Sequence, residues 1–133
     1  MTEANITIED LPSTKVIKLI HVSGQLDESN IDEKIQEVYK LLTPETKDIN
    51  LLFDLSSLEY VNSKSIGYLT DLYGKITEKG GRVAIAAAKP NILDILQVVG
   101  LTQLIQSFST IEEAKASIES SSAQGSLAGA PTS

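Results

Sequence analysis

Alternating apolar and polar residues in the first part of the chain predict two strands. Apolar side chains recur at about every second position in Ile6–Asp10 and again in Thr14–Gly24, a pattern typical of strands with one face against a core. The Leu-Pro-Ser sequence between them suits a turn, and Gly24 suits the end of the second strand. We therefore expect the domain to begin with two strands joined by a short connection.

A helical pattern follows this pair of strands. Between residues 31 and 42, apolar residues recur at steps of three and four, which places them on one side of a helix. Ser29 or Asn30 can cap its start, and Pro44 marks its end. We predict one helix in this segment.

The rest of the chain alternates between two patterns. Nearly continuous apolar runs predict buried strands at Asp48–Ser57 and Arg82–Ala88, and residues 104–110 suggest a short strand or an extended link. Helical spacing predicts helices at Ile66–Ile76, Pro90–Gly100 and Ile111–Glu119. Strands followed by alternating helices and strands indicate an α/β or α+β domain, with one small sheet covered by helices.

Composition narrows the class of protein. The 133 residues suit one domain, and 41% hydrophobic with 22% charged residues is typical of a soluble globular protein. The net charge of −7 argues against nucleic acid or an anionic membrane as a partner. Without cysteine, the chain has neither disulfides nor thiolate metal sites. We see no signal-peptide pattern and no apolar run of about 20 residues, so we expect a cytoplasmic protein.

The last residues differ in composition from the rest. Residues 119–133 contain one charged residue, no aromatic residue and many small ones, so they cannot bury enough apolar surface to offset the entropy of ordering. We expect a folded domain at 1–118 and a disordered tail at 119–133.

The sequence YVNSKSIGYL, at Tyr60–Leu69, carries the most informative polar residues. Ser63 lies where a predicted strand becomes a predicted helix, and the free N–H groups of a helix start stabilise a negative group. A phosphate on Ser63 would therefore be well placed. The alternative is that Ser63, or Asn62, serves only as the helix cap.

Enzymatic chemistry has little support in the sequence. Ser63–Gly67 comes close to the nucleophile elbow G-x-S-x-G, with Ser65 as the nucleophile, but the first glycine is missing. His21, the only histidine, precedes the serine instead of following it. No phosphate-cradle or metal-binding motif occurs. We expect no catalytic centre, no bound metal and no cofactor.

Asp27 and Asp54 each follow an apolar strand and precede a turn. Acidic residues in such places often accept hydrogen bonds from the local backbone. They could also gather with Ser63 at one edge of the sheet, and periodicity does not decide between these alternatives.

Taken together, these segments resemble the STAS domain, the family of bacterial anti-sigma factor antagonists. The resemblance extends from Ile6 to Ile118 and rests on the order and spacing of several short motifs. These are Gly24–Asp27, Asp54–Ser56 with Leu58 and Val61, Asn62–Gly67, Glu78–Ile85, Val99–Leu101, Phe108 and Ile111–Ala114. It implies an α/β fold with a small mixed sheet and helices packed mainly on one face.

The resemblance also implies a regulatory function. In that family, the serine at the position of Ser63 is phosphorylated by a Ser/Thr kinase that is also the anti-sigma factor, and a metal-dependent phosphatase restores it. The unmodified antagonist binds the kinase, which then releases its sigma factor, so transcription is regulated by partner switching. ATP and magnesium would belong to the kinase. We expect the partner surface around Ser63 to contain Asp27, Ser56, Asn62, Lys64 and Ser65.

This chain departs from the family pattern beside the acceptor. Asn62 replaces an aspartate, Lys64 a serine and Ser65 a glycine. Lys64 could stabilise a phosphate or alter recognition by the kinase, and Ser65 offers a second hydroxyl. These departures favour an alternative function, that of a constitutive STAS scaffold or accessory subunit in a larger complex, without a phosphoserine switch. The sequence does not predict an oligomeric state.

Overall fold

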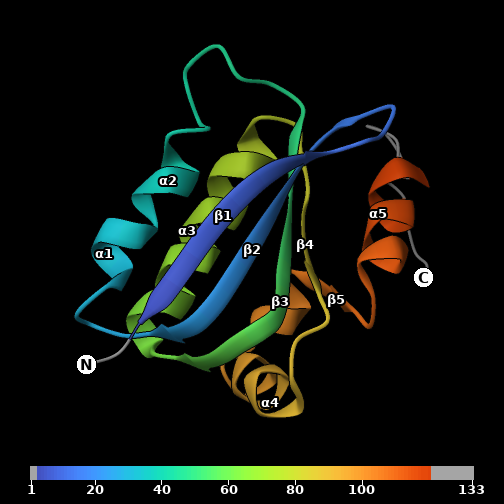
Figure 1. Cartoon of the computed structure of the whole chain (residues 1–133). Coiled ribbons are helices and arrows are strands. Elements are labelled where there is room, and N and C mark those ends of the chain that lie inside the picture. The colour runs from blue at the N-terminus through green and yellow to red at the C-terminus, as the bar shows by residue number, and fades with distance from the viewer. Residues whose placement is uncertain (1–2, 121–133) are drawn as a thin grey trace.

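The computed structural model describes residues 3–120, and its five strands form one sheet (Figure 1). In chain order the strands are β1 (Ala4–Leu11), β2 (Val16–Leu26), β3 (Ile49–Val61), β4 (Val83–Ala86) and β5 (Gln106–Phe108). They lie side by side in the same order, with β1 antiparallel to β2 and parallel pairing from β2 to β5. The predicted small mixed sheet of an α/β domain is confirmed.

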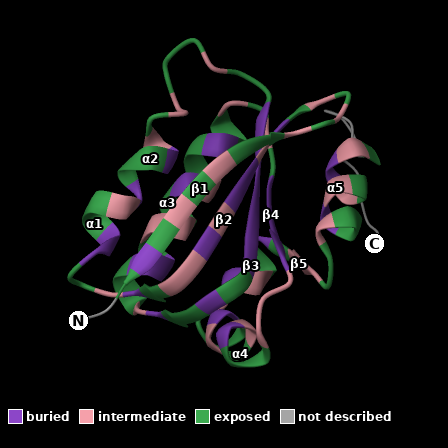
Figure 2. Ribbon diagram, in the orientation of Figure 1, coloured by how far each residue is buried: buried purple, intermediate pink, exposed green. Residues whose placement is uncertain are grey.

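The helices lie on both faces of this sheet. They are α1 (Ile31–Lys34), α2 (Gln36–Tyr39), α3 (Ser63–Glu78), α4 (Pro90–Val98), a short 3-10 helix η1 (Leu101–Gln103) and α5 (Ile111–Ser120). The four helices α1–α4 pack on one face around the larger apolar core, which includes Phe53, Leu72 and Ile85 (Figures 1 and 2). Among the described residues, only those of α5 cover the other face, through Ala114 and Ile118. The predicted packing of helices mainly on one face is confirmed.

One predicted helix is interrupted, and the last one extends a residue further than predicted. The helix expected before Pro44 is two short helices, α1 and α2, with a turn residue at Ile35 between them. The apolar spacing continues through that turn, because Ile31, Ile35 and Val38 are all buried, and so the pattern gives no sign of the break. At the other end of the described chain, α5 includes Glu119 and Ser120; the rest of the predicted tail lies outside the described residues.

The prediction that Gly24 ends the second strand is wrong, because β2 continues through Gly24 to Leu26. Its backbone φ is +84°, a value that residues with a side chain rarely adopt. A Cβ atom at this position would also lie 2.2 Å from the carbonyl oxygen of Glu3. β1 and β2 therefore approach closely at a position that only glycine fits.

β3 gains two residues relative to β2 along their parallel pairing. His21 of β2 pairs with Asp54 of β3, and Leu26 pairs with Val61. Between these two pairs β2 advances by five residues and β3 by seven. Extra residues of this kind bend a strand, and β3 curves toward the start of α1 at its C-terminal end (Figure 1). The end of β3 and the start of α3 therefore lie beside the connection from β2 to α1.

Candidate functional site

The start of α3 is capped by Asn62, which leaves Ser63 available for another role. The Oδ1 atom of Asn62 accepts hydrogen bonds from the backbone N–H of Ser65 at 2.9 Å and from the Ser65 hydroxyl at 2.6 Å. Ser63 is the first residue of α3 and is exposed. Within residues 3–120 its hydroxyl group makes no hydrogen bond. The sequence left either Ser63 or Asn62 as the cap of this helix, and the structure shows that it is Asn62.

Ser63 lies in a shallow hollow formed by two connections, β2–α1 and β3–α3. The hollow has a volume of about 480 Å³ and is lined by Asp27, Glu28, Ser29, Tyr60, Asn62, Ser63 and Lys64. Its two sides meet because β2 and β3 are parallel, so their C-terminal ends reach the same edge of the sheet. Three of the predicted surface residues, Asp27, Asn62 and Lys64, are therefore brought together with Ser63.

Asp27 and Asn30 shape the β2–α1 side of the hollow. The Oδ1 atom of Asp27 accepts hydrogen bonds from the backbone and the hydroxyl of Ser29, at 2.9 and 2.6 Å. Asn30 does not cap α1 with its side chain; instead it donates to the carbonyl of Gln25 at 2.9 Å and accepts from the N–H of Asp27 at 3.1 Å. These hydrogen bonds fix the connection in place.

Lys64 is the one cation that lines the hollow in the described part of the chain, and α1 holds it. Its Nζ lies 2.9 Å from Asp32 and 4.0 Å from Glu28. Asp32 also accepts a hydrogen bond of 2.5 Å from the hydroxyl of Tyr68. The Tyr68 hydrogen bond, followed by that of Lys64, lowers the pKa of Asp32, and the Asp32 contact raises the pKa of Lys64. Sequence reasoning missed this network, which links α1 to α3.

Two predicted partner-binding residues do not belong to this surface. Ser65 is only 3% exposed, because its side chain points inward and its hydroxyl donates to Asn62; the prediction that it lines the surface is wrong. Ser56 is exposed but does not line the hollow, and it lies seven residues before Ser63 in the chain. In contrast, Tyr60, which sequence reasoning missed, is 47% exposed and lines the hollow.

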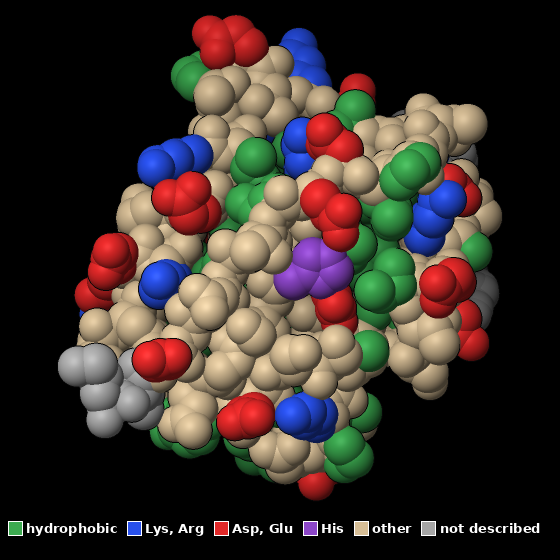
Figure 3. Space-filling view, in the orientation of Figure 1, with side chains coloured by type: hydrophobic (Ala, Val, Ile, Leu, Met, Phe, Trp, Pro, Cys, Tyr) green, Lys and Arg blue, Asp and Glu red, His purple; other side chains and the backbone are tan. Residues whose placement is uncertain are grey.

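His21 and Asp54 form a separate polar cluster on the face of the sheet that α5 leaves open. His21 Nδ1 lies 2.7 Å from Asp54 Oδ2, and His21 Nε2 lies 2.7 Å from Glu9 Oε2. In Figure 3 the histidine lies between two acidic side chains. The hydrogen bond with Glu9, aided by Asp54, raises the pKa of His21. Asp54 therefore does not gather with Ser63.

These positions bear on the hydrolase alternative. The Ser65 hydroxyl donates a hydrogen bond to Asn62, whereas both ring nitrogens of His21 are hydrogen-bonded to carboxylates on the sheet. A serine nucleophile requires a hydrogen bond to its base, and these two side chains have none. Within residues 3–120, no helix is long and apolar enough to cross a membrane, and no group of three acidic or histidine side chains could hold a metal ion.

The sequence and fold are similar to those of known proteins. The family model of the STAS domain matches residues 8–114. An anti-sigma F factor antagonist from Paenibacillus polymyxa is 22% identical over 101 residues, which cover 76% of this chain and 85% of the relative.

Solved structures share the fold. An anti-sigma factor antagonist from Mycobacterium paratuberculosis has a TM-score of 0.75 at 20% identity, with 87% of this chain and 94% of that chain covered. The Bacillus cell fate determinant SpoIIAA, in its phosphorylated form, has a TM-score of 0.64 at 16% identity, with 85% of this chain and 98% of that chain covered.

Proposed function

The chain belongs to the STAS domain family, and on this premise we propose that it is an anti-sigma factor antagonist switched by phosphorylation of Ser63. In this proposal the unmodified protein binds an anti-sigma factor that is also a Ser/Thr kinase, and a metal-dependent phosphatase restores it after modification. The relative from Paenibacillus polymyxa is described as an anti-sigma F factor antagonist, and the structure from Mycobacterium paratuberculosis as an anti-sigma factor antagonist.

The observation that carries the proposal is the unused hydroxyl of Ser63. Asn62 already caps α3, so modification of Ser63 leaves the cap in place. The modified side chain would project from an exposed position at a hollow that Asp27, Tyr60, Asn62 and Lys64 line. An exposed tyrosine beside a hollow is the type of residue that contributes most to binding interfaces.

A phosphate on Ser63 would change the charge of this surface more than its shape. It would add about 1.5 to 2 negative charges, and the first N–H groups of α3 favour a negative group there. Asp27 and Glu28 already make the hollow acidic, and Lys64 is bonded to Asp32. The phosphorylated surface would therefore repel acidic groups of a partner while α3 remains folded.

The engagement of Lys64 also favours a second candidate. Because Asp32 holds the one cation of the hollow, the surface could be a permanent contact of a STAS scaffold or accessory subunit. In that case phosphorylation has no role and partner binding is constitutive.

Mass analysis and binding measurements distinguish these functions. We expect protein purified from its own cells to carry one phosphatase-sensitive phosphate, mapped to Ser63. Binding to the kinase isolated from the same cells should be unchanged in Ser63→Ala and at least tenfold weaker in Ser63→Asp. Ser57→Asp is the matched control, since it adds the same charge at an exposed site outside the hollow. Equal binding by all three variants would exclude the switch and support the scaffold.

A further inference from the structure

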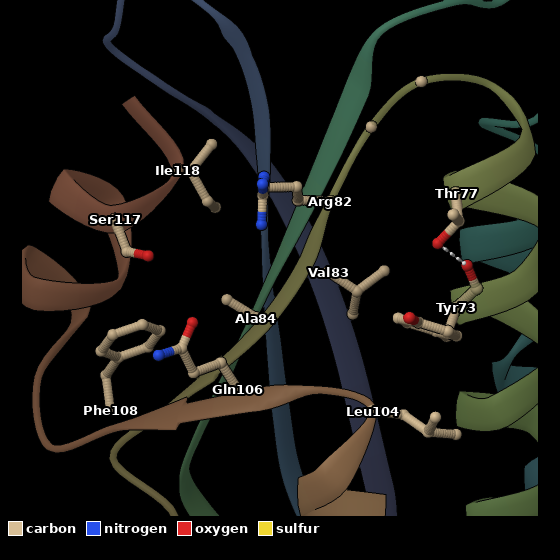
Figure 4. A pocket seen from close by; sticks show the side chains of 12 residues that line it. Tyr73, Thr77, Arg82, Val83, Ala84, Leu104, Gln106, Phe108, Ser117 and Ile118 are labelled. Carbon is tan, nitrogen blue, oxygen red and sulfur yellow. Dashed lines mark hydrogen bonds between the residues drawn. The ribbon is translucent and has the colours of Figure 1, made fainter. Parts of the chain in front are cut away.

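A groove between α3 and α5 lies at the open edge of β4, far from Ser63 (Figure 4). Its volume is about 340 Å³, which falls within the size range of small-molecule sites. Thr77, on its α3 wall, is 14 residues after Ser63 on the same helix, or about 21 Å along the axis. The groove is therefore separate from the proposed switch.

The groove exists because β5 is too short to cover β4. β5 pairs with β4 only from Ala84 onward. The N–H of Arg82 donates to Asn50 Oδ1 and its carbonyl accepts from Leu51, both at 2.9 Å, so both backbone groups of Arg82 face β3. Because backbone directions alternate along a strand, the N–H of Val83 faces the groove, and β5 provides no ladder partner for it. Val83 is only 7% exposed, so the groove contains a backbone donor in a largely buried place.

The same edge carries a guanidinium group that has no side-chain partner among the described residues. Arg82 is the only arginine in the sequence, and within residues 3–120 its side chain makes no ion pair or hydrogen bond. Figure 4 shows it directed toward α5, near Ser117 and Ile118. Although the chain has 18 acidic residues, none lines the groove. Side chains of Gln106 and Ser117 supply further hydrogen-bond donors.

The remaining walls of the groove are apolar. Ala84, Phe108 and Ile118 line the α5 side, and Leu104, 48% exposed, lies toward α3 (Figure 4). Binding sites for small molecules combine such walls with a few converging polar groups. A carboxylate has two oxygens, which can accept both a guanidinium fork and a backbone N–H.

We propose that this groove binds a small organic carboxylate that carries an apolar body. The carboxylate contacts Arg82 and the N–H of Val83, and the apolar body packs between Leu104 and Phe108. This assignment does not depend on phosphorylation of Ser63, because the two sites lie at opposite ends of α3.

The test is a titration of ¹⁵N-labelled protein with benzoate, followed by amide chemical shifts. We expect the largest shift at Val83, with smaller shifts at Gly81, Gln106 and Ser117. Benzamide, which keeps the ring without the charge, and inorganic phosphate, which keeps the charge without the ring, should each bind at least tenfold more weakly than benzoate. Comparable binding of either probe, or shifts scattered over the surface, would overturn the proposal.

Two variants locate the binding. Arg82→Gln should raise the Kd for benzoate at least tenfold, whereas Lys75→Gln, which removes a cation from α3 outside the groove, should leave it unchanged. Ser117→Phe fills the groove from the α5 wall and should also abolish the Val83 shift. Native-like binding by a folded form of either groove variant would contradict the assignment.

Discussion

On one face of the sheet, four helices cover a continuous apolar core, whereas on the other face, within residues 3–120, α5 alone covers a small cluster and leaves polar residues open. The covered face contains Phe53, Leu72 and Ile76, each no more than 1% exposed. The open part of the other face carries His21 between two carboxylates. We infer from this difference that most of the stabilising apolar contacts lie on the face covered by α1–α4. The face under α5 can therefore carry polar groups at little cost in folding free energy.

The largest effect should come from the covered face. Leu72→Ala should lower the free energy of unfolding by about 3 to 4 kcal/mol, because a side chain deleted from a closed core leaves a cavity. Ile118→Ala, on the other face, should cost about 2 kcal/mol, since the smaller cluster under α5 can relax around the deletion. Urea denaturation of both variants measures the contrast. Equal losses would mean that the two clusters are equally rigid.

A medium effect should follow from loss of the helix cap that supports the covered face. Asn62→Ala removes the acceptor for two hydrogen bonds from Ser65 and should destabilise the protein by about 1 kcal/mol. Asn62→Asp keeps an acceptor and should restore most of that loss. Ser63→Ala is the matched control and should change stability by less than about 0.5 kcal/mol, because Ser63 is exposed and is not the cap. Thermal unfolding of the three variants tests which residue caps α3.

The smallest effect should be the pH dependence of the open face. The contacts with Glu9 and Asp54 raise the pKa of His21, so the folded state binds the His21 proton more tightly than the unfolded state does. Their stabilisation is complete below the unfolded pKa of about 6.5 and is lost as the pH rises through the folded pKa. The loss should stay below about 1 kcal/mol, since solvent screens a partly exposed ion pair.

Urea midpoints at pH 6 and pH 8.5 measure this change. His21→Gln should remove the difference between the two pH values, and a native protein with the same midpoint at both would contradict the prediction. A drop of several kcal/mol would instead show that the open face contributes far more to stability than its exposure suggests.

Much of the fold could be predicted because apolar periodicity reports which residues face a core. The same periodicity could have placed Ser65 correctly, since Ser65, Leu69, Leu72 and Ile76 follow helical spacing and three of the four are buried. The prediction that Ser65 lines the partner surface is wrong because its place on the buried side of α3 outweighs the chemistry of its hydroxyl. For Asp27, the sequence left two alternatives open: a local backbone contact or a place beside Ser63. The second could be considered because the ends of neighbouring parallel strands reach one edge of the sheet.

Other contacts could not be predicted from the chain alone. Glu9, His21 and Asp54 come from three strands, and their meeting depends on the register of each pair. The Lys64–Asp32 ion pair depends on how α1 packs beside α3. Local patterns do not encode either relation, because pairing register and helix packing are set by the whole core.

The two residues that β3 gains over β2 also determine what kinds of length change the chain can accept. Leu55, Leu58 and Val61 are buried at steps of three, whereas a regular strand turns the same face inward at steps of two. Deletion of Ser57 would therefore remove one extra residue and still leave Leu58 and Val61 toward the core. Deletion of Glu59 as well would pull the start of α3 back by about 7 Å in total, away from Asp27. Both deletions should therefore yield a folded protein, and the double deletion should lack the hollow.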